Sequence, residues 1–153
     1  MLVRQLGPGD EDTVRTLRLR ALRDAPHEFS STYEREAART GAAWRAWFTP
    51  GATFVADDDD GPAGLVAAVR DSEEPDTAHL MALWVDPARR GSGVGDALVA
   101  AVLAWAQSQA MARTRLHVMA GNGPALRLYA RHRFRAVSEV EGDAGRQVVM
   151  ECP

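Results

Sequence analysis

The stretch RRGSGVGD, residues 89–96, has glycines at every second position, two arginines before them and an apolar run at helical spacing after them. A glycine-rich turn that leads into a helix presents backbone N–H groups that have no partner inside the helix. The helix dipole adds about half a positive charge at the same end. The pattern therefore predicts a site for an anion, and phosphate groups bind at such sites.

Two common phosphate-binding motifs do not fit this stretch. The nucleoside-triphosphate loop requires Lys and then Ser or Thr after its last glycine, where this chain has Asp96 and Ala97. The dinucleotide fingerprint requires its third glycine at position 96, and it begins directly after a strand. The glycines either hold another phosphate-bearing ligand or only form a tight turn, and the adjacent arginines favour the ligand.

The elements around the glycines alternate between strand and helix. An apolar run at 78–85 ends just before them and is typical of a strand that is buried on both faces. The other elements expected are a strand at 2–6, a helix from about 11 to 23, two helical pieces within 31–48, strands at 53–57 and 63–69, a helix after the glycines, a strand at 114–119, a helix at 121–132, and a hairpin of 134–141 and 146–152 around a turn at 142–145.

Length and composition limit the class of protein. A chain of 153 residues, 46% apolar and 25% charged, is expected to form a single domain over 1–153. No apolar run approaches the ~20 residues that span a bilayer, and the acidic start does not resemble a secretory signal, so a cytoplasmic protein without a membrane partner is expected. The lone Cys152 excludes an internal disulfide and a thiolate cluster, and no metal is expected. The net charge of −3 argues against a nucleic-acid partner.

The glycine stretch carries a resemblance to a known family. Arg90-Gly91-Ser92-Gly93-Val94-Gly95, followed by Asp96, matches the Arg/Gln-x-x-Gly-x-Gly/Ala motif of the GNAT superfamily of acyl-CoA-dependent N-acetyltransferases. The preceding LWVDPARR resembles the central strand of that family and its exit, and Asn122, Tyr129 and Phe134 resemble the second half of its coenzyme site. The order of the expected elements is similar to that of the family over essentially the whole chain.

This resemblance implies an α+β fold, in which a mixed, mostly antiparallel sheet of six to seven strands is flanked by about four helices and splayed between the fourth and fifth strands. Acetyl-CoA, the co-substrate, would lie in the gap with its pyrophosphate on the amides of residues 91–96. Its pantetheine arm would pair with the backbone at Leu83, Trp84 and Val85 like an extra strand. A fixed N–H in that strand would also stabilise the oxyanion that forms during acyl transfer.

Tyr129 and His79 are the catalytic residues that the resemblance implies. Tyr129 would donate its phenolic proton to the departing sulfur, or would only pack on the sheet, while Asn122 would contact the coenzyme, cap its helix or do both. His79 stands four residues before Leu83, where some relatives carry a catalytic Glu, and a neutral imidazole accepts a proton directly or through water. Its alternative is a packed, hydrogen-bonded residue, and His117 has a weaker claim to the base role.

Two further groups of side chains have open roles. Glu28, Ser31 and Glu34 fall in the segment that borders the acceptor cleft in this family, where they would bind a cationic substrate or form a solvated helix surface. The arginines of RLYARHRFR, residues 127–135, would reach the 3′-phosphate of the coenzyme or only solvate a helix face. The sequence does not choose between these roles.

The expected function is N-acetylation by direct transfer from acetyl-CoA to a primary amine, without a second nucleophile on the protein. A small-molecule amine is the expected acceptor, and a protein N-terminus or lysine is the alternative. A domain that binds acyl-CoA as a sensor without turning it over is a different class that also fits the motif. A homodimer is left open.

Overall fold

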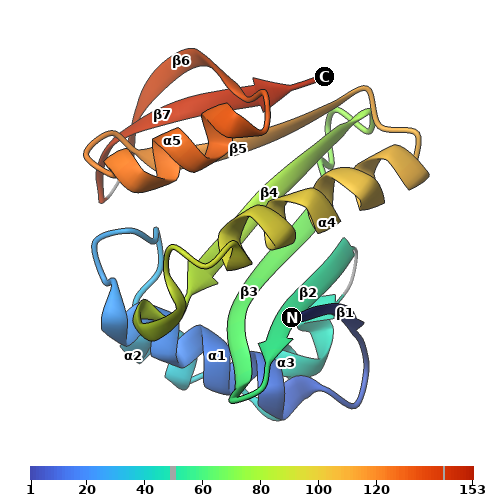
Figure 1. Ribbon diagram of the computed structural model, residues 1–153, viewed down its shortest axis with the longest axis vertical. Coiled ribbons are helices and arrows are strands. Elements are labelled where there is room, and N and C mark those ends of the chain that lie inside the picture. The colour runs from blue at the N-terminus through green and yellow to red at the C-terminus, as the bar shows by residue number, and fades with distance from the viewer. Residues whose placement is uncertain (49–50, 143) are drawn as a thin grey trace.

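The computed structural model describes residues 1–48, 51–142 and 144–153, and a seven-stranded sheet runs through it in the order β1-β2-β3-β4-β5-β7-β6 (Figure 1). Only β4 and β5 pair in parallel; the other neighbours are antiparallel. This confirms the expected α+β fold with its mixed, mostly antiparallel sheet. The strands are β1 (Leu2–Leu6), β2 (Gly51–Asp58), β3 (Gly61–Arg70), β4 (Thr77–Val85), β5 (Arg113–Met119), β6 (Arg135–Gly142) and β7 (Gly145–Cys152).

The helices begin where the sequence provides suitable first turns. Acidic side chains occupy the first turn of α1, and the hydroxyls of Thr32 and Thr40 accept backbone N–H bonds as the N-caps of α2 and α3. The helices are α1 (Glu11–Asp24), α2 (Tyr33–Ala37), α3 (Gly41–Arg45), α4 (Val94–Ser108) and α5 (Gly123–Arg131), with 3₁₀ turns η1 (Ala46–Phe48) and η2 (Pro87–Arg89).

Two local expectations are refined by the structure. The region 31–48 contains three short pieces, α2, α3 and η1, where two helical pieces were expected, because the chain tightens into a 3₁₀ turn directly after α3. The hairpin of β6 and β7 forms as expected. Its turn includes Asp143, which lies outside the described residues.

Helices cover both faces of the sheet. α4 packs across β2, β3 and β4, and its buried side chains share one core with Tyr129 of α5 and Leu116 of β5. α1 and α3 cover the other face, where a second core includes Leu17, Trp44 and Trp84. Each core anchors one set of elements around the central strand β4, so β4 is held from both sides.

The sheet opens along β4. Pairing with β5 is limited to Thr77–His79 opposite Arg113–Arg115, and beyond this point the strands diverge (Figure 1). Further along β4, Ala82 and Leu83 stand opposite the single residue Val66 of β3, and Ala82 has φ +59°. Such a bulge bends the strand and redirects its backbone groups. The last residues of β4 therefore remain attached to β3 while their other edge faces the gap.

Candidate active site

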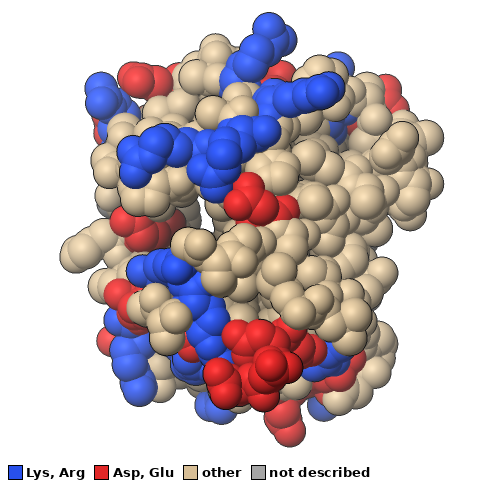
Figure 2. Space-filling model, viewed as in Figure 1, with Lys and Arg blue, Asp and Glu red and all other residues tan. Residues whose placement is uncertain are grey.

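A pocket of about 880 Å³ occupies the gap between β4 and β5. Its walls come from residues 24–29 after α1, from Leu83–Val85 at the end of β4, from the glycine turn, and from Asn122 with α5. Figure 2 shows this face of the molecule, with a hollow that has arginine side chains on its upper and lower rims and acidic side chains beside them. The pocket thus joins three regions that are far apart in the sequence, 24–29, 83–96 and 122–131.

The glycine turn presents main-chain amides to the pocket. Gly93 is the N-cap of α4 with φ +90°, and Gly91 has φ +80°, which is a conformation that residues with a Cβ rarely adopt. A Cβ atom added to either glycine would meet nothing within 4 Å, so both face open space. Ala97 donates to the Gly93 carbonyl at 3.0 Å, and the amides of residues 94–96 have no partner inside the helix.

The other motif residues divide between the pocket and the core. A Cβ on Gly95 would lie 3.1 Å from Leu128 Cδ2, so this glycine lets α5 approach the start of α4. The Ser92 hydroxyl donates to the Arg89 carbonyl, and the Val94 side chain is buried. Arg90, Gly91, Gly93, Gly95 and Asp96 line the pocket, whereas Ser92 and Val94 do not.

Asp96 places a carboxylate beside these amides, and basic side chains of the α5 region neutralise it. Its oxygens lie 3.2 Å from Arg131 Nη2 and 2.8 Å from His132 Nε2. The Arg131 hydrogen bond and that of His132 lower the pKa of Asp96 even though desolvation opposes the shift. Arg127 and Arg131 both line the pocket, so two arginines of the 127–135 stretch reach the place where phosphates are expected.

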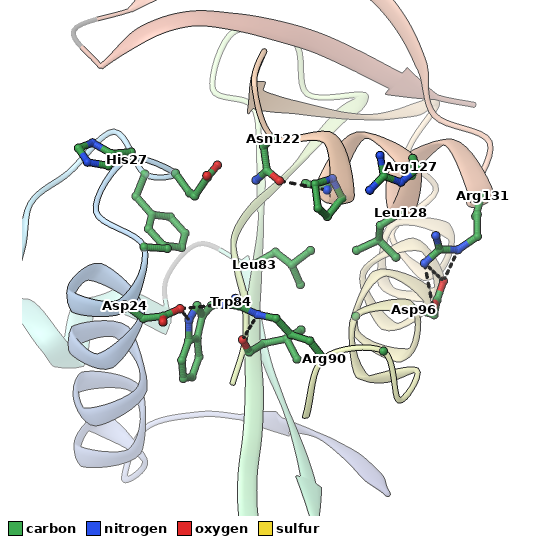
Figure 3. A pocket seen from close by; sticks show the side chains of 18 of the residues that line it. Asp24, His27, Leu83, Trp84, Arg90, Asp96, Asn122, Arg127, Leu128 and Arg131 are labelled. Carbon is green, nitrogen blue, oxygen red and sulfur yellow. Dashed lines mark hydrogen bonds and ion pairs between the residues drawn. The ribbon is translucent and has the colours of Figure 1, made fainter. Parts of the chain in front are cut away.

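Asn122 and Tyr129 belong to the start and the inner face of α5. The Asn122 Oδ1 accepts the Ala125 N–H at 3.2 Å as the helix cap, while the residue also lines the pocket, which leaves its amide donor for a ligand (Figure 3). Tyr129 lies one turn after Ala125, is 6% exposed, and meets Phe134 edge to face at 5.8 Å. It is not among the residues that line the pocket, whereas Ala125 and Leu128 of the same helix are, and burial raises its pKa above the ordinary 10.0.

The end of β4 forms the floor of the pocket. Leu83 points into its centre in Figure 3, and Trp84 beside it donates from Nε1 to Asp24 Oδ2 at 3.0 Å. Arg90 Nη2 donates to the same oxygen at 2.7 Å, and Arg90 Nε donates to the Val85 carbonyl at 3.1 Å. The motif arginine is therefore held against the floor by a carboxylate at the end of α1.

The end of the pocket formed by the segment after α1 is a loop whose side chains include His27, Glu28 and Phe29. The Arg18 guanidinium lies 4.9 Å from the Phe29 ring centroid and makes two hydrogen bonds of 2.9 Å to Glu36 of α2. Burial alone would raise the pKa of Glu36, but the hydrogen bonds and charge of Arg18 lower it below 4.5. A buried ion pair thus holds both ends of this loop.

The structure separates the remaining predicted residues from the pocket. His79 lies where β4 still pairs with β5, and its Nε2 is 2.6 Å from Asp71 Oδ2. The His79 hydrogen bond is the main cause that lowers the pKa of Asp71 to about 2. His117 contacts Gln147 on the neighbouring strand. Neither histidine lines the pocket, so the geometry gives no support to the prediction that His79 is the base.

Sequence reasoning did not identify several residues of the pocket. Of the three polar residues that were expected at the cleft, Glu28 lines the pocket, whereas Ser31 and Glu34 do not. Glu28 and Ser31 lie in the loop before α2, which begins at Tyr33. Asp24 and His27 were not singled out. An aspartate in the last turn of a helix opposes the helix dipole, and this was the available signal that Asp24 has a tertiary partner.

Two features are absent from the described residues, a membrane-spanning helix and a cluster of metal-ligating side chains. In the stretches 1–48, 51–142 and 144–153, no helix is long and apolar enough to cross a membrane. Within the same residues, no three His, Cys, Asp or Glu side chains are grouped as metal ligands would be.

Comparisons with known proteins agree with this architecture. A mycothiol acetyltransferase from Acidothermus cellulolyticus is 32% identical over 148 residues, which cover 87% of this chain and 44% of the relative. Another from Kineococcus radiotolerans is 33% identical over 146 residues, which cover 95% of this chain and 46% of the relative. The chain spans less than half of the length of these curated relatives.

Solved structures share the fold at lower identity. A GCN5-related N-acetyltransferase from Kribbella flavida has a TM-score of 0.80 at 23% identity, with 99% of this chain and 96% of that chain covered. An acetyltransferase of the GNAT family from Streptococcus pneumoniae has a TM-score of 0.81 at 20% identity, with 99% and 97% covered. The family model for the acetyltransferase (GNAT) family matches residues 17–134. This chain therefore belongs to the GNAT acetyltransferase family.

Proposed function

We propose that this chain is an acetyl-CoA-dependent N-acetyltransferase that transfers the acetyl group directly to the primary amine of a small molecule. One observation carries the proposal: a single pocket has a glycine-rich turn with free helix amides at one end, and at the other a loop carboxylate that has no ion pair among the described residues. The gap between β4 and β5 joins the two ends. The two substrates therefore meet beside the end of β4.

The residues present fit the coenzyme. The amides of residues 91–96 and the open space at Gly91 and Gly93 suit a pyrophosphate. Arg127 adds positive charge beside them, while Arg131 balances the carboxylate of Asp96. The edge of β4 that faces the gap offers its backbone at Leu83 and Val85 to the amides of a pantetheine arm. Asn122 offers its side-chain amide from the opposite wall.

The chain stabilises the charges that acyl transfer creates. Acetyl-CoA, when bound, supplies an activated thioester whose carbon–sulfur bond breaks as the amine nitrogen bonds to the carbonyl carbon. A backbone N–H near the bulge at Ala82 and Leu83 stabilises the negative charge that develops on the carbonyl oxygen. We assign the proton donor for the departing sulfur to Tyr129, whose neighbours along α5, Ala125 and Leu128, line the pocket.

Glu28 is the group we assign to the amine. Three carboxylates line the pocket, and two of them are neutralised: Asp24 by Arg90, and Asp96 by Arg131. Among the residues that the structure describes, no ion pair engages Glu28, so its carboxylate is free to hold an ammonium group and accept its proton. The mycothiol acetyltransferases among the relatives support a small-molecule acceptor.

The test is steady release of coenzyme A thiol from acetyl-CoA in the presence of a panel of amines. The panel contains small primary amines, among them the acceptor of the mycothiol acetyltransferases, and peptides with free N-termini and lysines. Amine-dependent turnover of small molecules is expected. Turnover with peptides but not with small amines would show that the acceptor is a peptide or protein. Tight coenzyme binding without turnover across the panel would show that the chain is an acyl-CoA sensor.

A further inference from the structure

We propose that Asp24 is a positioning residue that couples the acceptor end of the pocket to its coenzyme end. The proposal rests on the proposed function for the identity of the two ligands. Asp24 is the last residue of α1 and the first residue of the pocket-lining loop 24–29. Its carboxylate therefore belongs to the acceptor wall by sequence.

The same carboxylate contacts the coenzyme wall through one oxygen. Oδ2 accepts from Trp84 Nε1 at 3.0 Å and from Arg90 Nη2 at 2.7 Å. Trp84 lies between Leu83 and Val85 on the edge of β4, and Arg90 begins the glycine turn. Figure 3 shows the three side chains converging below Leu83. Three walls of the pocket thus meet at one atom.

Local structure does not account for an acidic residue at this position. A carboxylate in the last turn of a helix lies at the negative end of the dipole, which disfavours it. The indole N–H and the guanidinium compensate, and the Arg90–carboxylate bond is charge-assisted, so it is shorter and stronger than a neutral one. The contact that makes Asp24 favourable is therefore the contact between the walls.

A second set of contacts makes the junction stiff. Arg20, one turn before Asp24, donates to Asp86 at 2.7 Å and lies 5.1 Å from the Trp84 ring centroid. Asp86 also accepts from Arg89 at 2.9 Å, beside the glycine turn. Further side-chain contacts therefore join the end of α1 to the segment 84–90, and Asp24 is the α1 residue of this junction that lines the pocket.

This arrangement has a thermodynamic consequence. A ligand that orders the glycine turn also fixes Arg90, and Arg90 in turn fixes Asp24 at the start of the acceptor loop. The loop is then already partly ordered, so it loses less conformational entropy when an amine binds. Coupling is reciprocal, so coenzyme A and the acceptor strengthen the binding of each other by the same factor. We expect this factor to be about fivefold or more, which is the range usual for coupled sites.

Hydrogen exchange with coenzyme A alone tests the coupling without knowledge of the acceptor. In the wild-type protein, coenzyme A should slow amide exchange both at 91–96 and at 25–32. In Asp24→Ala, protection should remain at 91–96 and fall clearly at 25–32, where only the Arg20 contacts still join α1 to the segment 84–90. Asp24→Asn should keep part of the distant protection, because its side-chain oxygen still accepts from Trp84 and Arg90. A purely structural role would not produce this ligand-dependent pattern.

Matched variants complete the design. Asp57→Asn removes a carboxylate that pairs with Arg4 at 2.6 Å on the far strands, and it should behave as wild type. Arg90→Gln removes the Arg90 partner of the Asp24 carboxylate and replaces Asp24→Ala if that variant does not fold. In Arg90→Gln, coenzyme A should slow amide exchange at 91–96 but not at 25–32. In the wild-type protein, the amine with the highest turnover should bind about fivefold tighter when coenzyme A is present than when it is absent. In Asp24→Ala, the affinity for that amine should be the same with and without coenzyme A.

The outcomes separate this proposal from the proposed function. A wild-type protein that does not bind coenzyme A would remove the proposed function, and the coupling with it. Coenzyme binding without protection at 25–32, or with the same protection in Asp24→Ala, would overturn the coupling alone. The second result would mean that the ligand touches the loop directly.

Discussion

The two walls of the pocket are built from different material. The coenzyme wall is main chain, because the amides of the glycine turn and the edge of β4 are fixed by a helix start and by strand pairing. The acceptor wall is a loop with exposed side chains, and it is held by the Arg18–Glu36 ion pair and by Asp24. Main-chain recognition suits a ligand that never changes, whereas side chains on a loop let one fold accept different amines.

Breaking the buried ion pair should have the largest effect, and only on the acceptor wall. Glu36→Gln leaves the Arg18 guanidinium buried without a counter-charge, and we expect a loss of about 3 kcal/mol in the free energy of unfolding. Glu34→Gln, an exposed change on the same helix, should alter it by less than about 0.5 kcal/mol. Urea unfolding of both variants measures the contrast; equal small losses would mean that the pair does not hold the loop.

The same pair predicts a dependence of stability on pH. The folded-state pKa of Glu36 lies below its ordinary value of 4.5, so the unfolded chain binds more protons as the pH falls. The contribution of Glu36 is fully present above pH 4.5 and is lost as the pH falls through its folded pKa. In Glu36→Gln this part of the acid dependence should be missing from unfolding curves recorded below that pH.

Tyr129→Phe tests the inner face of the coenzyme wall. The change removes one oxygen and keeps the ring against Phe134, so the fold should survive. We expect kcat to fall by about 10- to 100-fold, at the low end for general-acid catalysis, because a thiolate is a tolerable leaving group without a proton donor. Because the lost bond forms as the transition state breaks down, kcat/KM should fall equally. Full kcat over a wide pH range, with chemistry limiting the rate, would leave Tyr129 as a packing residue.

A pair of variants decides between the two candidate bases. Glu28→Gln should lower kcat/KM by about tenfold for a cationic amine, with partial recovery as rising pH deprotonates the amine in solution. His79→Ala should change it less than about twofold, since His79 lies outside the pocket and is bonded to Asp71. A larger loss of kcat/KM in His79→Ala than in Glu28→Gln, seen in pH–rate profiles, would identify His79 as the base and would remove Glu28 from that role.

The sequence predicted the glycine turn at the start of α4 because its determinants are local. Glycines at alternate positions before an apolar helix specify a positive φ and free amides within a few residues. The mostly antiparallel sheet was expected from the resemblance to the GNAT superfamily. The acceptor wall depends on contacts between distant residues. Asp24 forms hydrogen bonds with residues 60 and 66 positions away. His79 was expected in the site because of its distance from Leu83 along the strand, but it lies where β4 still pairs with β5. No local pattern carries that information.

The most direct test of the account is calorimetric titration of acetyl-CoA into the wild-type protein and into Gly93→Val. A valine at φ +90° is strained and puts a side chain where a phosphate must approach. Affinity should fall by about tenfold or more in a variant that is still folded by circular dichroism, since both the turn and its amides are displaced. Unchanged affinity in folded Gly93→Val would contradict the claim that this turn holds the coenzyme.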